Sequence, residues 1–159
     1  MKVVCDASTL IALSRINALN LLKQQVTELT IPDAVYEELA RGKNKPGIKE
    51  IVQAEWIQRK TVQNRTLIQQ LHQSLHAGEC EAIVLAKEMA VDFVILDDAH
   101  ARKVAEAEGL RVVGLLAILL NAKQNGLIKK IRPLLDALKQ NGFFMKEDLY
   151  SLLLLKAGE

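Results

Sequence analysis

Aromatic residues and cysteines are scarce in this chain of 159 residues, and both shortages limit what it can be. Aromatic residues make up 4% of the sequence while hydrophobic residues make up 50%, so aliphatic side chains must form the core. The only two cysteines, Cys5 and Cys80, fall in different expected elements and form no CxxC pair. We therefore expect two free thiols in a reducing compartment, not a disulfide or a zinc site.

Long apolar runs are also missing. Asp6 interrupts the first apolar segment, so we expect no secretory signal, and stretches such as residues 152–155 are too short to span a bilayer. The net charge is only +2, which is compatible with a polyanionic partner but does not demand one. We expect a cytoplasmic protein with no membrane segment, folded as a single domain over residues 1–159.

Short apolar runs alternate with stretches of helical periodicity along most of the chain. We expect strands at residues 2–5, 29–31, 56–62, 93–96 and 112–113. We expect helices at residues 10–16, 19–24, 33–39, 48–54, 67–75, 79–89, 99–108, 115–125 and 133–140, and from residue 146 onward. Ser8 or Thr9 is expected to cap the first helix, and Gly78 to break the chain before residue 79. The alternation predicts an α/β fold with a parallel sheet and helices on both faces.

Acidic residues follow two of the expected strands: Asp6 comes after the first, and Asp97 and Asp98 come after the fourth. In open α/β sheets, ligands bind outside the carboxyl ends of the strands, where the strand order reverses. If the first and fourth strands are neighbours there, these acids converge. Four more acids lie in helices that follow loops on the same side: Glu37, Glu38, Glu79 and Glu81.

A cluster of carboxylates points to a bound cation, because like charges repel one another and burial disfavours their ionised form. Oxygen ligands suit Mg²⁺ or Mn²⁺, which also bind phosphate oxygens. Such an ion lowers the pKa of a bound water and stabilises charge on a reacting phosphodiester. Because no histidine or cysteine belongs to the set, it favours metal-assisted phosphodiester hydrolysis over zinc chemistry.

Helical geometry separates some of these acids and leaves others open. With Val35 and Leu39 facing inward, Glu37 points nearly opposite and Glu38 flanks the apolar stripe, so Glu38 is the better ligand. Glu79 and Glu81 lie about 160° apart around an ideal helix, so both are not expected to face one ion. The side chains of Asp97 and Asp98, which are adjacent at the end of the fourth strand, are also expected to point in different directions.

Four motifs in a fixed order carry a resemblance to a known family: VCDASTLIALSRI, IPDAVYEEL, GECEAIVLAKE and VILDDAHARKVAEAEGLRVVGLLAILLNAKQNGLI. They resemble the PIN-domain family, most of all its predicted nucleases related to VapC toxins. The resemblance covers nearly the whole chain. It implies a three-layer α/β/α fold with a mostly parallel sheet of four to five strands and an endoribonuclease that depends on Mg²⁺ or Mn²⁺. It also implies homodimers, an RNA substrate and, for toxins, an antitoxin partner.

The resemblance also carries the family's acids onto this chain. The residues that it assigns to catalysis and to the metal ion are Asp6, Glu38, Glu79 and Asp98. Glu79 is selected because it keeps Ala86 and Asp98 in register without a gap. A glutamate at this position departs from the aspartate common in many PIN proteins. Its longer side chain implies that it contacts the metal ion more loosely or through a water molecule. The secondary candidates are Ser8, Glu81 and Asp97.

Each assigned acid also has a purely structural interpretation. Asp6 and Asp98 could cap helices, Glu79 could favour a helix N-terminus by its charge, and Glu38 could be a surface residue. For Glu81 we expect a solvated helix face, and for Glu37 a surface position. Arg102 could touch an RNA phosphate or pair with Glu106 one turn further on. The alternative to a nuclease is therefore a non-catalytic PIN-fold module that binds nucleic acid or protein.

Overall fold

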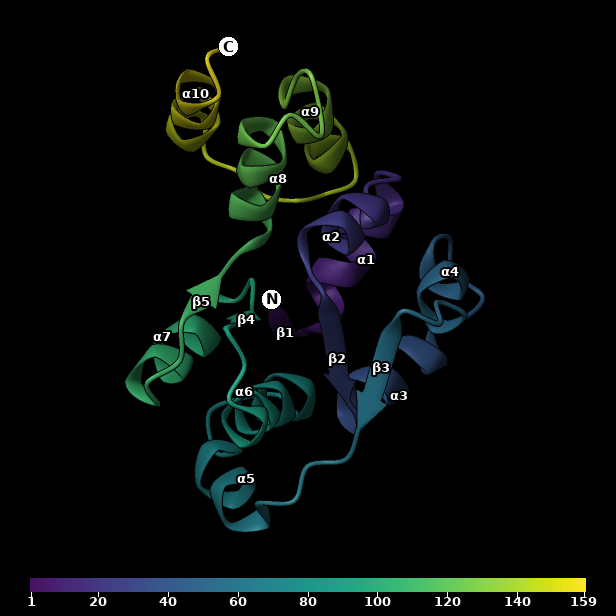
Figure 1. Ribbon diagram of the computed structural model, residues 1–159, viewed down its shortest axis with the longest axis vertical. Helices are drawn as coiled ribbons and strands as arrows, with labels where there is room; N and C mark the ends of the chain where they lie inside the picture. The colour runs from purple at the N-terminus through teal and green to yellow at the C-terminus, as the bar shows by residue number, and fades with distance from the viewer.

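A computed structural model describes all residues 1–159 and contains one five-stranded sheet. The strands are β1 (Lys2–Cys5), β2 (Glu28–Pro32), β3 (Ile57–Lys60), β4 (Phe93–Ile95) and β5 (Val112–Val113). They lie in the order β3-β2-β1-β4-β5, and every neighbouring pair is parallel. The predicted α/β class with a parallel sheet is confirmed (Figure 1).

Ten helices surround the sheet. They are α1 (Ala7–Arg15), α2 (Leu19–Gln25), α3 (Asp33–Arg41), α4 (Ile48–Val52), α5 (Arg65–Leu71), α6 (Ala77–Met89), α7 (Ala99–Ala107), α8 (Leu115–Gln124), α9 (Arg132–Gln140) and α10 (Glu147–Lys156). Every expected helix is present, with ends shifted by a few residues. Figure 1 shows α8, α9 and α10 gathered at one end of the molecule, beyond the sheet.

Two predicted helix boundaries were wrong. The first helix begins at Ala7 with Asp6 as its N-cap, so neither Ser8 nor Thr9 caps it. Gly78 does not break the chain, because α6 already begins at Ala77 and Gly78 lies in its first turn. In both cases the helix starts earlier than its apolar periodicity suggests, since the first turn is polar or small.

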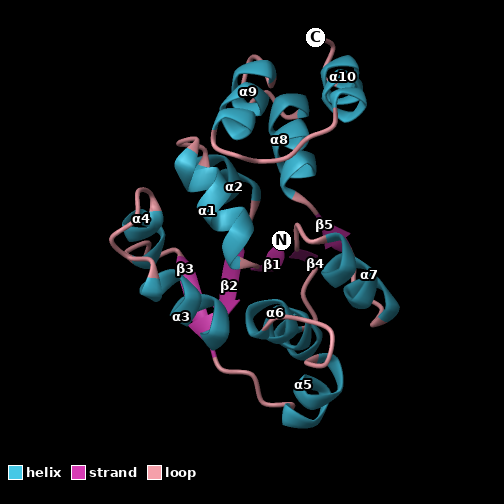
Figure 2. Cartoon of the chain, turned by 180° about the vertical axis from the view of Figure 1, so that it is seen from behind, coloured by secondary structure: helices cyan, strands magenta, loops and turns pink.

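Side chains alternate between the two faces of the sheet and join two apolar clusters. Val3 and Cys5 of β1 belong to the larger cluster, with buried residues of α1–α4 and α8–α10. Val4 belongs to the smaller one, which is formed mainly with α6 and α7 and is flanked by α5. Figure 2 shows α5, α6 and α7 grouped together, with α3 next to α6. The sheet is therefore covered on both faces, as a three-layer fold requires.

The strand order reverses between β1 and β4. The chain adds β2 and β3 on one side of β1, then crosses over to place β4 and β5 on the other. Cys5 stands opposite Ile95 in the parallel register, and the Asp6 N–H donates to the Ile95 carbonyl at 3.1 Å. The residues that follow these two strands therefore leave the sheet side by side, as the sequence predicted.

Both cysteines are buried and unpaired, which confirms the expected free thiols. They lie in different clusters, Cys5 in the larger and Cys80 in the smaller. None of the ten helices combines the length and the apolar character needed to cross a membrane.

Candidate active site

Asp6 is the most buried acid at the carboxyl edge of the sheet, with a relative exposure of 4%. Its Oδ1 accepts the Thr9 N–H at 3.0 Å, which caps α1. Its Oδ2 accepts the Ser8 hydroxyl at 3.1 Å and the Asp97 N–H at 3.1 Å. These three donors fix the Asp6 carboxylate between α1 and the end of β4, because a buried charge is tolerated only with such partners.

The two acids after β4 differ in surroundings. Asp97 is half-buried, and burial raises the pKa of its carboxyl; the negative charge of Asp6 raises that pKa further, while Arg102 opposes the rise. Asp98 is exposed and caps α7, since its Oδ2 accepts the Ala101 N–H at 2.9 Å. The adjacent side chains thus diverge, as expected, and both remain at the same edge.

Glu79 reaches this edge from the first turn of α6. Its Oε2 accepts the His76 N–H at 3.3 Å, which satisfies a main-chain donor at the helix start. Burial raises the pKa of Glu79, and the negative charges of Asp98 and Asp6 raise it further. The helix therefore holds a third carboxylate within electrostatic reach of the two strand ends.

Glu38 lies against Gly78, in the first turn of α6, because α3 packs against α6. A methyl group at Gly78 would come within 3.1 Å of Glu38 Oε2 and 3.5 Å of Val35 Cγ2. Any larger residue at position 78 would therefore require the Glu38 carboxylate to move by a few tenths of an ångström. Gly78 thus bears on the position of Glu38, which sequence reasoning missed, although a glycine before an acidic helix start was visible in GECEA.

Arg102 is half-buried at the same edge. A methyl group at Gly114 would come within 3.0 Å of its Nη1, so the guanidinium lies against the start of α8. Its positive charge lowers the pKa of Asp97. The alternative ion pair with Glu106 is not formed. One cation therefore stands beside the acidic cluster.

Asp6, Glu79 and Asp98 thus lie within electrostatic reach of one another where the strand order reverses, and Glu38 of α3 lies against Gly78. The family model for DUF3368, described as a PIN domain, matches residues 2–159 of this chain. The chain belongs to the PIN-domain family. No curated protein and no solved structure matches it. PIN domains are generally nucleases that use divalent metals, so this fold is a nuclease-like one.

Glu81, a secondary candidate, lies between α6 and α3 in the PIN domain. Its Oε1 accepts the Ala34 N–H at 3.2 Å, so it satisfies a donor in the first turn of α3. Its side chain is half-buried, so the expectation of a solvated helix face was wrong. Glu81 ties α6 to α3, and Glu79 is left as the acid of this pair that points to the strand ends.

The acids of the PIN domain share one edge but do not form a finished metal site. No three His, Cys, Asp or Glu side chains are arranged so that they could hold one ion. The reason is visible in their bonds: Asp6, Glu79 and Asp98 each accept a main-chain N–H of a helix start. The donor set nevertheless fits a hard divalent cation, because it is all carboxylate, and because burial and then the charges of Asp98 and Asp6 raise the pKa of Glu79.

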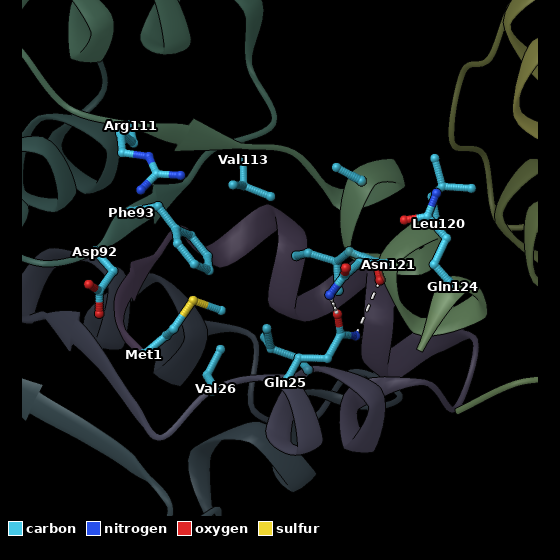
Figure 3. Close-up of a pocket in the computed structure, with 13 residues that line it drawn as sticks. Met1, Gln25, Val26, Asp92, Phe93, Arg111, Val113, Leu120, Asn121 and Gln124 are labelled. Atoms are coloured by element: carbon cyan, nitrogen blue, oxygen red, sulfur yellow. Dashed lines mark hydrogen bonds between the residues drawn. The ribbon is translucent and has the colours of Figure 1, made fainter. Parts of the chain in front are cut away.

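The amino edge of the sheet carries a cavity of about 450 Å³, between α2 and α8 (Figure 3). Its walls are mostly apolar and include Met1, Val26, Phe93 and Val113. At one end the Asn121 amide donates to Gln25 Oε1 at 2.7 Å. None of the site acids lines this cavity, so its size is unrelated to the candidate chemistry.

Proposed function

We propose that this PIN domain is an endoribonuclease that hydrolyses RNA phosphodiester bonds with the help of Mg²⁺ or Mn²⁺. The observation that carries the proposal is the bond from the Asp97 N–H to Asp6 Oδ2 at 3.1 Å, at the point where β1 and β4 end together. Ligand sites of open α/β sheets lie at this position. Glu79 supports the proposal, since its pKa responds to the charges of both strand ends.

In this proposal, Asp6, Glu38, Glu79 and Asp98 hold the divalent ion. A bound divalent ion would supply an activated water and would neutralise charge on the reacting phosphate. Asp6 is kept in place by Ser8, Thr9 and the main chain of Asp97, so it is the fixed point of the set. Arg102 binds a phosphate oxygen of the RNA, since a guanidinium matches phosphate geometry.

The direct test is RNA cleavage in the presence of Mn²⁺ or Mg²⁺. Structured and single-stranded RNA are incubated with the wild type and with Asp6→Asn and Asp98→Asn. The exchange removes one charge from each acid and keeps a residue that caps helices as well. We expect both variants to lose cleavage. Equal degradation by all three proteins would mean contamination and would remove the proposal.

We also propose the cell-biological setting that the VapC-like motifs imply. The protein would be the toxin of a toxin–antitoxin pair, act in the cytoplasm and bind an antitoxin protein. The two unpaired cysteines support a reducing compartment. Residues 1–159 would form one domain, because both apolar clusters pack on the same sheet. Growth arrest on induced expression, absent in Asp98→Asn, tests the toxin role.

We propose a homodimer formed by α10. Leu149, Leu152 and Leu155 are 40%, 44% and 76% exposed and lie within about 120° on one side of the helix. Asp148 precedes this stripe, Lys156 follows it, and neither has an ion-pair partner. Leu152 lies midway between Asp148 and Lys156, four residues from each. Two antiparallel copies would therefore place Asp148 of each opposite Lys156 of the other.

A charge exchange tests this dimer by sedimentation. Asp148→Lys or Lys156→Asp alone should weaken self-association, and the two together should restore it. Leu152→Glu should abolish it, whereas Leu127→Glu, at a 38% exposed residue outside α10, should not. The face is small compared with a stable interface of about 1,200 Å² or more, so we expect a concentration-dependent dimer. A monomer at all concentrations would exclude the proposal.

The second candidate function is a PIN-fold module that binds RNA or protein without cleaving. It is favoured by one observation: no three acids are arranged to hold a metal ion. Calorimetry with Mn²⁺ separates the two functions. A nuclease should bind the ion, and Asp6→Asn should weaken the binding. A non-catalytic module should bind RNA equally well with and without the ion.

A further inference from the structure

A second cavity opens directly beside the acidic edge. It measures about 310 Å³ and lies between α1, α9 and the loop that leads to α10. Glu38 and Ser8 line it, and the Ser8 hydroxyl also donates to Asp6 Oδ2 at 3.1 Å. The cavity shares no residue with the larger one at the amino edge. It is at the small end of ligand pockets, and it begins at the proposed catalytic acids.

The cavity is apolar on its walls and has one aromatic side chain. Ile11 and Ala12 of α1 and Leu138 of α9 form part of the lining. Phe143, in the loop after α9, is half-buried and packs against the larger apolar cluster. Its ring is therefore held in place by the core, while part of it remains free. A fixed aromatic ring on an apolar wall is a stacking surface.

Polar groups complete the lining. Arg15 is exposed and has no carboxylate within ion-pair distance. It follows Ser8 by seven residues on α1, which corresponds to about 10 Å along the helix. The Asn141 Nδ2 donates to the Ala137 carbonyl at 2.8 Å, so the Asn141 Oδ1 remains available as an acceptor. The cavity thus offers a cation and an amide oxygen next to the aromatic ring.

We propose that this cavity is a nucleobase subsite, in which one base of single-stranded RNA stacks on Phe143 beside the scissile phosphate. Asn141 accepts a hydrogen bond from the base, and Arg15 binds a phosphate of the same strand. The inference rests on the proposed nuclease function, because it takes the acids at the mouth of the cavity as the cleavage site. The base has to be unpaired, since a base inside a duplex cannot expose its face to a side chain.

This chemistry favours RNA over a protein ligand. The Arg15 guanidinium has no ion-pair partner, so it is free to bind a phosphate of a strand that runs past the acids. Every base has a π-face, so stacking on Phe143 requires only an unpaired nucleotide. A cavity of this size with a single aromatic ring is expected to take one base, and specificity should therefore be concentrated at one position of the strand.

Neighbouring phenylalanines provide a matched test. Phe143 lines the cavity, whereas Phe144 is 82% exposed and does not. Both are changed to alanine in an Asp98→Asn background, which keeps the RNA intact, and the Kd for a fluorescent single-stranded oligoribonucleotide is measured by anisotropy. We expect Phe143→Ala to raise Kd roughly tenfold and Phe144→Ala to leave it within about twofold. Phe143→Tyr should restore binding.

Two further binding measurements test the subsite if the Phe143→Ala variant does not fold. An oligonucleotide with one abasic residue, moved along the strand, should lose affinity at one position only, and that loss should disappear in Phe143→Ala if it folds. Arg15→Gln should reduce the slope of log Kd against log salt by about 1, while Lys23→Gln, in the last turn of α2, should not.

The outcomes distinguish this inference from the function it rests on. Wild type that cleaves RNA, with equal Kd for the two phenylalanine variants and no abasic position that matters, would overturn the subsite and leave the nuclease. Wild type that does not cleave, but binds RNA through Phe143, would support the subsite and remove the nuclease. A cavity that serves a partner protein would also give equal RNA affinities, and so would overturn the inference.

Discussion

The same five strands form both edges of the sheet, but the carboxyl edge is acidic and the amino edge is mostly apolar. At the carboxyl edge, Asp6, Asp97 and Asp98 leave β1 and β4 where the strand order reverses, and helix starts bring further acids to them. At the amino edge, α2 and α8 flank a mostly apolar cavity of about 450 Å³ (Figure 3). This cavity lies at the edge without the acids. Strand order, not cavity size, locates the candidate chemistry.

One pair of residues makes the comparison direct. Asp6 at the carboxyl edge and Asp92 at the amino edge each accept a main-chain N–H: Thr9 donates to Asp6 at 3.0 Å and Lys2 donates to Asp92 at 2.7 Å. They differ in burial, since Asp6 is 4% exposed and Asp92 is exposed. Hydrogen bonding to the backbone is thus common to both edges, and only the carboxyl edge buries the charge.

The largest effect is expected when the charge of Asp6 is removed, and the same substitution at Asp92 is the control. Asp6→Asn should reduce the RNA cleavage rate roughly 100-fold or more, because charge at the reacting centre is lost. Asp92→Asn should leave the rate unchanged. Asp92→Asn should shift thermal unfolding little, whereas Asp6→Asn should lower the melting temperature, because one buried acceptor oxygen becomes an NH2 group that faces a donor. Cleavage kinetics and a melting curve for each protein provide the check. If Asp92→Asn lost as much activity as Asp6→Asn, the distinction between the edges would fail.

A smaller effect is expected from adding one methyl group at the carboxyl edge. Gly78→Ala would bring a carbon within 3.1 Å of Glu38 Oε2 and displace the carboxylate. We expect roughly a tenfold loss of rate with little change in stability, since alanine is the better helix former. In kinetics, Gly78→Ala combined with Glu38→Gln should be no worse than Glu38→Gln alone. Additive losses would show that Gly78 acts through something other than Glu38.

Asp97 gives a pH-dependent prediction for stability. Its pKa is raised above the ordinary 3.8 by burial and by Asp6, so the native state disfavours its ionised form. The stability that its protonated form contributes is full below pH 3.8 and is lost as pH rises through the raised pKa. In EDTA at pH 7, Asp97→Asn should therefore raise the free energy of unfolding by roughly 0.5 kcal/mol after solvent screening.

Denaturant unfolding at several pH values measures this difference. The gain from Asp97→Asn should vanish in acid, where wild-type Asp97 is protonated as well. Adding Mg²⁺ at pH 7 should reduce the gain, because a cation offsets the repulsion that the substitution removes. A gain that is constant with pH would assign the effect to packing instead of charge.

The smallest effect is expected at the amino edge. Ala117→Leu adds an apolar side chain at the cavity between α2 and α8 while keeping helix propensity. We expect RNA cleavage to stay within about twofold and stability to change by no more than about 1 kcal/mol. Cleavage assays run beside the other variants measure it. A large loss of activity would give the amino-edge cavity a role that its lining does not suggest.

The sequence alone predicted the elements well and the site partly. Apolar runs bounded by polar residues identified every strand, and the placement of acids after the first and fourth runs identified the carboxyl edge. It failed for Glu81 and Gly78. The bond from the Ala34 N–H to Glu81 and the approach of Glu38 to Gly78 both depend on how α3 packs against α6, and no local pattern encodes that packing.

By itself, the sequence determined which residues are apolar, where the strands and helices form and which acids follow the strands, because these depend on local periodicity and side-chain chemistry. The tertiary structure decided which acids become neighbours. It brought β4 beside β1, and it placed the Asp97 N–H against Asp6 Oδ2, 91 residues away in the chain. It also brought Phe143 and Arg15 to one cavity, although they are far apart in the chain. Such contacts arise only when distant elements pack, because packing is set by the whole core.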